Sequence, residues 1–134
     1  MPLLLKSADP RLIFVSGLGR FSDCVNRNWP LPPDLKPGWP KKEVTFETVG
    51  YRCTKVALNM LMLDYHWKLE NDGVKVWAVL PGFLVTDLGG GRDIVGKMGA
   101  QHPSAGGQLM RKVLEGERDD QIGRLIDKNG IREF

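Results

Sequence analysis

A tyrosine and a lysine four residues apart, Tyr51 and Lys55, are the side chains of this sequence best placed to do chemistry. On an α-helix, residues at i and i+4 lie on one face, one turn apart. A free phenol titrates near ~10, too high for proton exchange at neutral pH, and a nearby cation favours the phenolate. Two unit charges roughly 4 Å apart at an effective dielectric of about 20 interact by about 4 kcal/mol, which corresponds to at most roughly three pKa units. The pair therefore predicts Tyr51 as a general acid and base whose pKa Lys55 lowers.

The spacing of this pair is weak evidence by itself. A tyrosine and a lysine often meet at this distance by chance, and they are then a surface phenol beside a solvated ammonium. A short motif becomes a useful hypothesis only in the right structural context. The elements on either side of residues 51–55 must therefore supply that context.

Two apolar segments flank the helix that carries the pair. The run Leu12–Val15 has the continuous hydrophobicity of a strand buried on both faces, and Ser16 follows it. Apolar residues then recur near the helical period over Tyr51–Leu69. A second strand is expected at Val74–Leu80, where Pro81-Gly82 ends it. This order predicts a parallel βαβ unit, in which Ser16 and the loop after the second strand open at the same edge of the sheet.

The segment 21–50 lacks periodicity and contains several prolines and tryptophans, among them Trp29-Pro30 and Trp39-Pro40. It is expected to be a long irregular loop, and loops of this length inside a domain are usually functional. We expect its tryptophans to cover another part of the molecule. A proline-rich ligand at Pro30–Pro33 for an SH3-type partner stays an alternative.

The remaining segments give weaker signals. Residues 2–8 look like the end of a helix. Short helices are expected at residues 93–98 and 103–115, and a last short strand near residues 123–126. No internal repeat is visible.

The length and the amino-acid composition are those of one ordinary globular domain. The 134 residues lie within the roughly 100–200 expected of a single domain. Scattered basic residues and a net charge of +3 do not favour nucleic acid or an anionic membrane as a partner. Two isolated cysteines, Cys24 and Cys53, indicate neither a disulfide framework nor a metal site. Without a signal peptide or membrane-spanning run, the protein is expected to be cytoplasmic.

Three features in a fixed order carry a resemblance: a strand followed by Ser16, a helix that opens with Tyr51 and Lys55, and a strand that ends in Pro81-Gly82-Phe83-Leu84-Val85-Thr86-Asp87. This order resembles the carboxy-terminal half of the short-chain dehydrogenase/reductase family, closely over residues 51–88 and more loosely elsewhere. The proline- and tryptophan-rich segment and the stretch Gly116–Asp119 look most like a fungal branch. The resemblance implies an α/β fold with a partial Rossmann-like, doubly wound parallel sheet that lacks its first strands. Residues 1–134 would be the carboxy-terminal portion of an NAD(P)-binding domain.

The resemblance also implies roles for four residues. Tyr51 would exchange a proton with the oxygen of a carbonyl or secondary alcohol substrate. Lys55 would lower the pKa of Tyr51 and hold the ribose hydroxyls of NADP, with NAD not excluded. Leu84 and Thr86 would contact the nicotinamide end of the cofactor. The implied activity is that of an oxidoreductase, in secondary metabolism.

The sequence departs from the family at the serine that contacts the substrate oxygen. That serine usually lies one residue further past the strand than Ser16, so an ungapped match puts Gly17 there. Two interpretations follow: Ser16 serves in its place, or the contact is missing. Ser16 could also be a simple turn former at the end of the strand.

The larger departure concerns the glycine-rich turn that cradles the cofactor pyrophosphate in a βαβ unit. Nothing like that unit precedes Met1, so we expect about half of a dinucleotide fold to be absent. Gly17-x-Gly19-x-x-Ser22 and the run Gly89–Gly91 are weak alternatives for a phosphate loop. The second of these is better explained as a flexible loop on the substrate side.

Two hypotheses remain. The first is a truncated NAD(P)H-dependent oxidoreductase, and the second is a non-catalytic fragment or dimerisation partner that lacks the cofactor turn. In both, the helix Tyr51–Leu69 could form a homo-oligomer. A sheet without its first strands would expose an apolar edge, which predicts poor solubility or obligate association.

Overall fold

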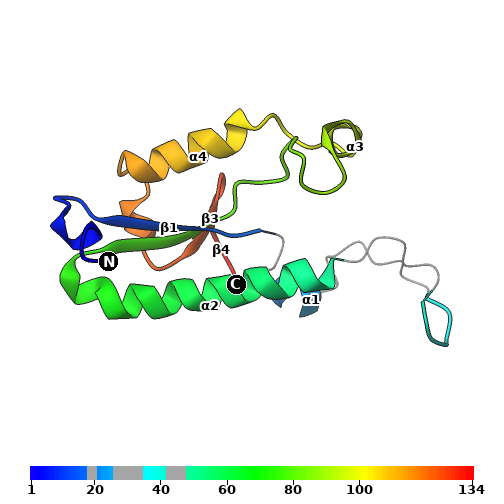
Figure 1. Ribbon diagram of the computed structural model, residues 1–134, viewed down its shortest axis with the longest axis horizontal. Coiled ribbons are helices and arrows are strands. Elements are labelled where there is room, and N and C mark those ends of the chain that lie inside the picture. The colour runs from blue at the N-terminus through cyan, green and yellow to red at the C-terminus, as the bar shows by residue number, and fades with distance from the viewer. Residues whose placement is uncertain (18–20, 26–34, 42–47) are drawn as a thin grey trace.

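The computed structural model describes residues 1–17, 21–25, 35–41 and 48–134, and these form three layers (Figure 1). A four-stranded sheet lies between helix α2, Val49–Leu69, and helix α4, Ser104–Leu114. This is the predicted α/β architecture, with a mostly parallel sheet and helices on both faces.

The sheet has the strand order β1-β2-β3-β4. Its members are β1 (Arg11–Val15), β2 (Lys75–Val79), β3 (Leu125–Asp127) and β4 (Gly130–Arg132). β1, β2 and β3 are parallel, and β4 runs antiparallel to β3. The two strands expected around the long helix are therefore confirmed to within one residue at each end, and the last predicted strand lies two residues later than its expected start.

The predicted βαβ unit is confirmed by the register of its two strands. Val15 at the end of β1 lies opposite Val79 at the end of β2. The amide of Ser16 continues this pairing by donating to the Val79 carbonyl at 2.8 Å. The segments that follow the two strands therefore begin at the same edge of the sheet, as expected of parallel strands.

β4 is an element that the sequence analysis did not predict. It forms a hairpin with β3 through the two-residue turn Lys128-Asn129, and Gly130, which has positive φ, pairs with Asp127 at the start of β4. The Asp127 carboxylate accepts a hydrogen bond from the Asn129 amide at 2.7 Å and so stabilises the turn. The Asn-Gly dipeptide that overlaps this turn was a turn signal in the sequence, although it would have placed the turn one residue later.

The core consists of two clusters, one on each face of the sheet. Alternate residues of β2 point to opposite faces, as the pleat requires. Val76 and Ala78 pack with Met62 of α2 on one face, and Trp77 and Val79 pack against α4 on the other. β2 is buried on both faces because a helix covers each of them, whereas β1 at the edge of the sheet is only half-buried.

The other helices lie close to their expected positions, with small differences. α3 is Arg92–Lys97, and α4 begins and ends within one residue of its prediction. The expected helix end at residues 2–8 is only the 3-10 turn η1, Leu4–Lys6. Two further 3-10 turns, η2 (Glu70–Asp72) and η3 (Asp119–Gln121), were not predicted.

The prediction of one irregular loop over residues 21–50 is wrong at both ends. Phe21–Val25 forms the short helix α1, and α2 begins two residues earlier than expected. Trp39 is 88% exposed, so the expectation that it covers another part of the molecule is also wrong. Trp29 and the Pro30–Pro33 segment lie outside the described residues.

Candidate active site

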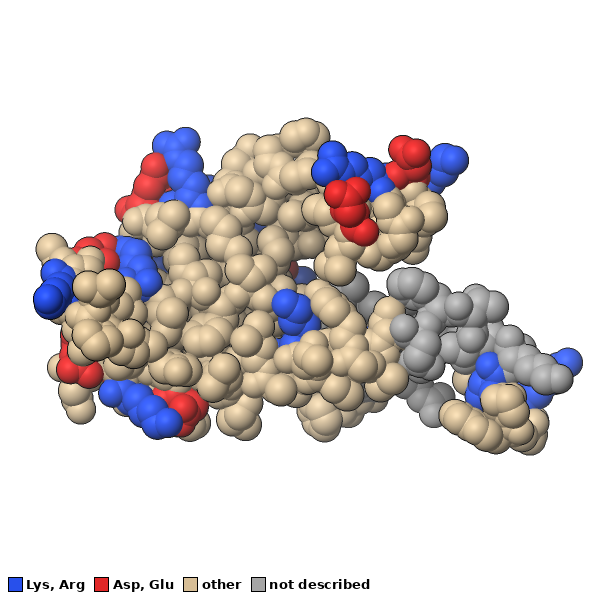
Figure 2. Space-filling model, viewed as in Figure 1, with Lys and Arg blue, Asp and Glu red and all other residues tan. Residues whose placement is uncertain are grey.

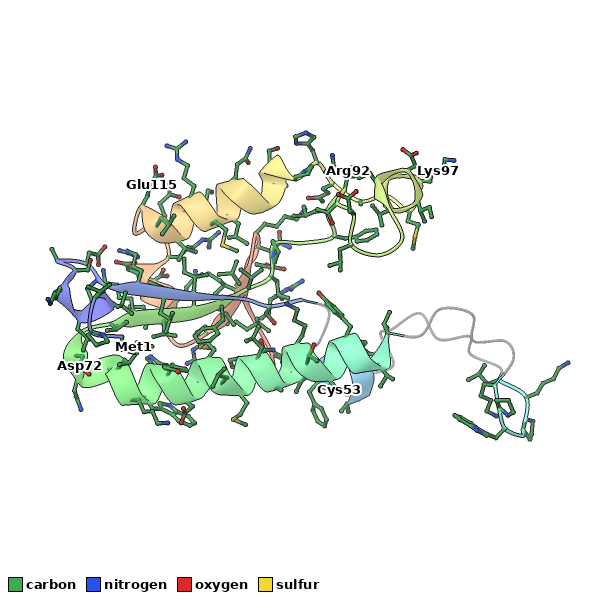
Figure 3. All side chains as sticks on the ribbon, viewed as in Figure 1. Met1, Cys53, Asp72, Arg92, Lys97 and Glu115 are labelled. Carbon is green, nitrogen blue, oxygen red and sulfur yellow. The ribbon has the colours of Figure 1, made fainter. Side chains whose placement is uncertain are left out.

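The predicted site residues gather where the carboxyl ends of β1 and β2 meet the amino-terminal half of α2. Figure 1 shows these strand ends pointing toward the end of the molecule where α2 begins. In Figure 3, Cys53 marks this half of α2 and Asp72 marks the opposite end, beyond the helix. The first two turns of α2 carry Tyr51 and Lys55, so helix geometry brings both side chains to the end of β1.

The Tyr51 phenol lies against the backbone of Gly17. A Cβ added at Gly17 would overlap the phenol oxygen, and it would lie 3.2 Å from Cζ of the ring. It would also lie 3.4 Å from Cγ of Lys55. The absence of a side chain at position 17 therefore allows the hydroxyl to come this close to the strand end.

The Lys55 ammonium is directed to the same strand end. Its Nζ donates a hydrogen bond to the Val15 carbonyl at 2.9 Å, and it lies 5.6 Å from the centroid of the Tyr51 ring. The predicted lowering of the Tyr51 pKa is not what this arrangement gives, since burial raises the pKa of the phenol. The Lys55 ammonium is near the ring but is hydrogen-bonded to the backbone. Burial, which removes water from the phenol, therefore changes the Tyr51 pKa more than the nearby cation does.

The Ser16 hydroxyl faces a different partner from the one expected. It donates a hydrogen bond to Oδ1 of Asn59 at 2.6 Å, and both side chains are only 3% exposed. The Tyr51 hydroxyl lies beside Gly17, where an added Cβ would overlap it. Both interpretations from sequence therefore stay predictions, with the Ser16 hydroxyl directed to Asn59 and no side chain at position 17.

Asn59 is a site-proximal residue that sequence analysis missed. It follows Tyr51 and Lys55 at the same spacing of four residues, so the three side chains form one stripe along α2. The sequence did contain a signal for it, because Asn59 is a polar residue that continues the four-residue spacing of Tyr51 and Lys55. A buried amide needs a hydrogen-bond partner, and Ser16 supplies it.

Leu84 and Thr86 lie on the segment that leaves β2 toward α3, and both are half-buried. Leu84 pairs with Gln101 in an isolated bridge, and its side chain packs against Gly106 of α4. The Thr86 hydroxyl accepts a hydrogen bond from the Leu88 amide at 3.3 Å. Among the described residues, no hydrogen bond joins either side chain to Tyr51 or Lys55, so only the shared edge of the sheet relates the two groups.

The two weak candidates for a phosphate loop gain no support. The short helix α1 follows Gly17-x-Gly19, but it has only five residues. Gly89, Gly90 and Gly91 all have positive φ and lead into α3, which has six. Neither helix is long enough to offer the N-terminal dipole of a dinucleotide site.

Other features of the described residues lie away from this site. A surface hollow of about 240 Å³ is lined by α4 and the residues after it, namely Gln108, Arg111, Lys112, Glu115 and Glu117. No three potential metal ligands come together in the part of the chain that the structure describes. In the same part, none of the helices combines the length and apolar character needed to cross a membrane.

Known proteins are similar in sequence to nearly the whole of this chain. The short-chain dehydrogenase/reductase tropE of Talaromyces stipitatus is 47% identical over 134 aligned residues, which cover 97% of this chain and 49% of that protein. The short-chain dehydrogenase/reductase eupG of a Phoma species is 40% identical, and the alignment covers 98% of this chain and 50% of the relative. The chain therefore spans about half the length of the curated relatives that it matches. No family model matches the chain.

The fold is also found among solved structures. The carbonyl reductase from chicken fatty liver, solved with NADPH bound, superposes with a TM-score of 0.71 at 22% identity. The match covers 99% of this chain and 49% of that protein. At this identity the likeness establishes the Rossmann-type fold, and the site must be judged from its own residues.

Proposed function

Because this chain belongs to the short-chain dehydrogenase/reductase family, we propose that it carries the proton-transfer side of a nicotinamide-dependent oxidoreductase site. The substrate would be a small carbonyl compound or secondary alcohol, in secondary metabolism. One observation carries the proposal: on α2, the Lys55 ammonium donates to Val15 at the end of β1, and one turn earlier the Tyr51 phenol lies against Gly17, two residues beyond that strand. This is the edge at which open α/β sheets bind their ligands.

Tyr51 acts as the acid in the direction of reduction. Its pKa is raised by burial, so the phenol keeps its proton at neutral pH and can donate it to the carbonyl oxygen. As the carbonyl carbon gains hydride, its oxygen gains negative charge, and the phenol proton neutralises that charge to give the alcohol. The Lys55 ammonium then stabilises the tyrosinate that remains.

NADP(H), with NAD(H) as the alternative, supplies the hydride when it is bound. Lys55 would hold its ribose hydroxyls, because this ammonium has three donors and only the Val15 carbonyl as a hydrogen-bond partner among the described residues. Leu84 and Thr86 would lie beside the nicotinamide. The described residues offer no glycine-rich turn for the pyrophosphate, so the chain fits only the nicotinamide half of the cofactor.

A second function is supported by the apolar side chains that α2 exposes, since Met60 and Trp67 are both 63% exposed. The chain would then be a non-catalytic fragment or partner that associates with another protein through this surface. This alternative keeps the fold and the α2 surface but needs no cofactor. The two functions differ in whether NADPH binds.

Titration of the full chain with NADPH, followed by cofactor fluorescence, tests the proposal. We expect a dissociation constant below about 1 mM, corresponding to roughly −4 kcal/mol. Lys55→Met should weaken binding, because it removes the cation that would meet the ribose. Lys68→Met is the matched control, since Lys68 lies on the same helix with its side chain 68% exposed and paired with Asp64.

Failure of the parent chain to bind millimolar NADPH would refute the proposal and favour the fragment. Equal binding by Lys55→Met and Lys68→Met would refute the role of Lys55. Parallel titration with NADH distinguishes the two cofactors.

A further inference from the structure

Ser16 and Asn59 form a buried hydrogen bond directly beside the proposed acid–base site. The bond is 2.6 Å long, and it joins the residue after β1 to the third turn of α2. In the part of the chain that the structure describes, Ser16 and Asn59 are the two buried polar residues, each only 3% exposed. Burial of a polar group costs desolvation free energy, and a hydrogen bond offsets that cost only in part. We therefore consider what the buried pair does for the neighbouring residues.

The geometry relates the pair to both site residues. Tyr51, Lys55 and Asn59 follow one another at intervals of four along one face of α2. Each contacts a different residue of one short segment: Tyr51 lies against Gly17, Lys55 donates to the Val15 carbonyl, and Asn59 accepts from Ser16. The helix and the strand end therefore meet at three consecutive points.

The three contacts differ in their exposure to water. Tyr51 is 37% exposed, and Lys55 is half-buried with a long flexible stem. A hydrogen bond that water can reach is easily exchanged, whereas one sealed from water leaves two unsatisfied groups when it breaks. The Ser16–Asn59 bond is thus the contact of the three that is best shielded from water.

We propose that Ser16 and Asn59 are positioning residues that hold the end of β1 against α2, so that Gly17 and the Val15 carbonyl meet Tyr51 and Lys55. This rests on the proposed function of Tyr51 and Lys55, and it assigns Ser16 a role different from contact with the substrate. Loss of the bond lets the strand end separate from the helix and admits water to the phenol. Because burial is what raises the Tyr51 pKa, that pKa then falls.

The chain contains only two tyrosines, which makes a direct measurement feasible. Tyr65→Phe leaves Tyr51 as the single tyrosine, and the substitution is mild because Tyr65 packs its ring against Phe14 with centroids 5.8 Å apart. Tyrosine labelled with carbon-13 at Cζ then reports the titration of Tyr51 alone by NMR. No cofactor or substrate is needed.

In this background, Ser16→Ala and Asn59→Ala should each shift the Tyr51 pKa downward, toward the ~10 of a free phenol. The double variant should shift it no further than the larger single shift, because both substitutions remove the same bond. Ser16→Cys keeps the volume with a much weaker donor, and it should give the same downward shift if Ser16→Ala does not fold.

Met62→Ala is the matched control. Met62 is fully buried on the same helix, so its truncation should lower the unfolding temperature while leaving the Tyr51 titration unchanged. The proposal is overturned if Ser16→Ala and Asn59→Ala leave the titration at its parent value, or if Met62→Ala shifts it equally. A chain that binds no NADPH but shows the predicted shifts would refute the proposed function and keep the positioning role.

Discussion

At the residue scale, the candidate site depends on a glycine, Gly17. Position 17 has no side chain, and the Tyr51 hydroxyl occupies the space that a Cβ would take. A side chain cannot be restored at this position while Tyr51 keeps its place, because the added Cβ would overlap the phenol oxygen. The position of the Tyr51 hydroxyl therefore requires a glycine at position 17.

Gly17→Ala should displace the Tyr51 ring, because the partly exposed ring moves more easily than the strand. Overpacking of this kind costs about 1–3 kcal/mol in a closed core, and we expect the lower end here because the ring can turn into solvent. The check combines urea unfolding with the Cζ signal of Tyr51 in the Tyr65→Phe background. Gly50→Ala is the control, since a Cβ at Gly50 meets no atom within 4 Å. An unchanged Tyr51 signal in Gly17→Ala would contradict the close contact.

At the residue scale, the structure brings Tyr51 and Lys55, the two main candidates from the sequence, to the same strand end, but the sequence did not show how their side chains lie there. Tyr51 and Lys55 stood out because their spacing and their position between two strands agreed. The sign of the Tyr51 pKa shift could not be predicted, since sequence spacing does not show where a flexible lysine directs its ammonium. Asn59 could not be paired with Ser16, because 43 residues separate them in the chain.

At the scale of helices and strands, the elements with a strong sequence signal were predicted, and those with a weak signal were not. α2 and the two strands beside it were predictable because long periodic or continuously apolar segments leave few alternatives. α1 has five residues, too few to show a helical period. β4 has only three residues, and the Asn-Gly dipeptide that overlaps its turn was a weak signal because Gly130 already belongs to the strand.

An ion network holds the ends of these elements opposite the candidate site. Arg11 at the start of β1 donates to both carboxylate oxygens of Asp119 in η3, at 2.6 and 3.0 Å. Lys75 at the start of β2 donates to Asp119 at 2.6 Å and contacts Asp9 at 2.8 Å. Two strands and the segment after α4 are thereby tied together.

The network predicts a pH dependence of stability. The hydrogen bond from the Arg11 guanidinium holds the pKa of Asp119 at about 2, below the ordinary value of 3.8. A carboxyl group with a lowered pKa in the folded state contributes stability above its unfolded pKa, and that contribution is lost as pH falls through the folded pKa. The unfolding temperature should therefore decrease between pH 4 and pH 2, and this part of the decrease should be absent in Asp119→Asn. Asp93→Asn, at an exposed position of α3, should retain the parent profile.

Two surfaces of the whole molecule are more apolar than a lone domain requires. β1 pairs only with β2 among the described residues. Its apolar residues Leu12–Phe14 are half-buried, and Val15 is 49% exposed. Met60, Leu61 and Trp67 of α2 are 63%, 44% and 63% exposed. Figure 2 shows charged side chains toward the ends of one face, with a mostly uncharged surface along α2 between them. Exposed apolar surfaces of this kind mark sites of association.

We propose that α2 mediates association between two copies of the chain, with Trp67 as the anchor, because large aromatic side chains dominate the energy of such interfaces. Met60→Lys combined with Trp67→Lys should convert the chain to a monomer in size-exclusion chromatography with light scattering. Leu114→Lys is the matched control, since Leu114 is 59% exposed on α4 and should not change the oligomeric state. A monomeric parent chain would contradict the role of α2.

The central claim is that Tyr51 transfers a proton at the end of β1, and NADPH-dependent reduction of a small ketone by the full chain tests it most directly. We predict measurable turnover in the parent chain and in Tyr65→Phe, and a rate roughly 10²–10⁴-fold lower in Tyr51→Phe, the range typical of a lost general acid. Tyr51→Phe keeps the ring and removes only the hydroxyl, so the comparison isolates the proton. A Tyr51→Phe chain as active as Tyr65→Phe, or a parent chain without turnover at saturating NADPH, would contradict the claim.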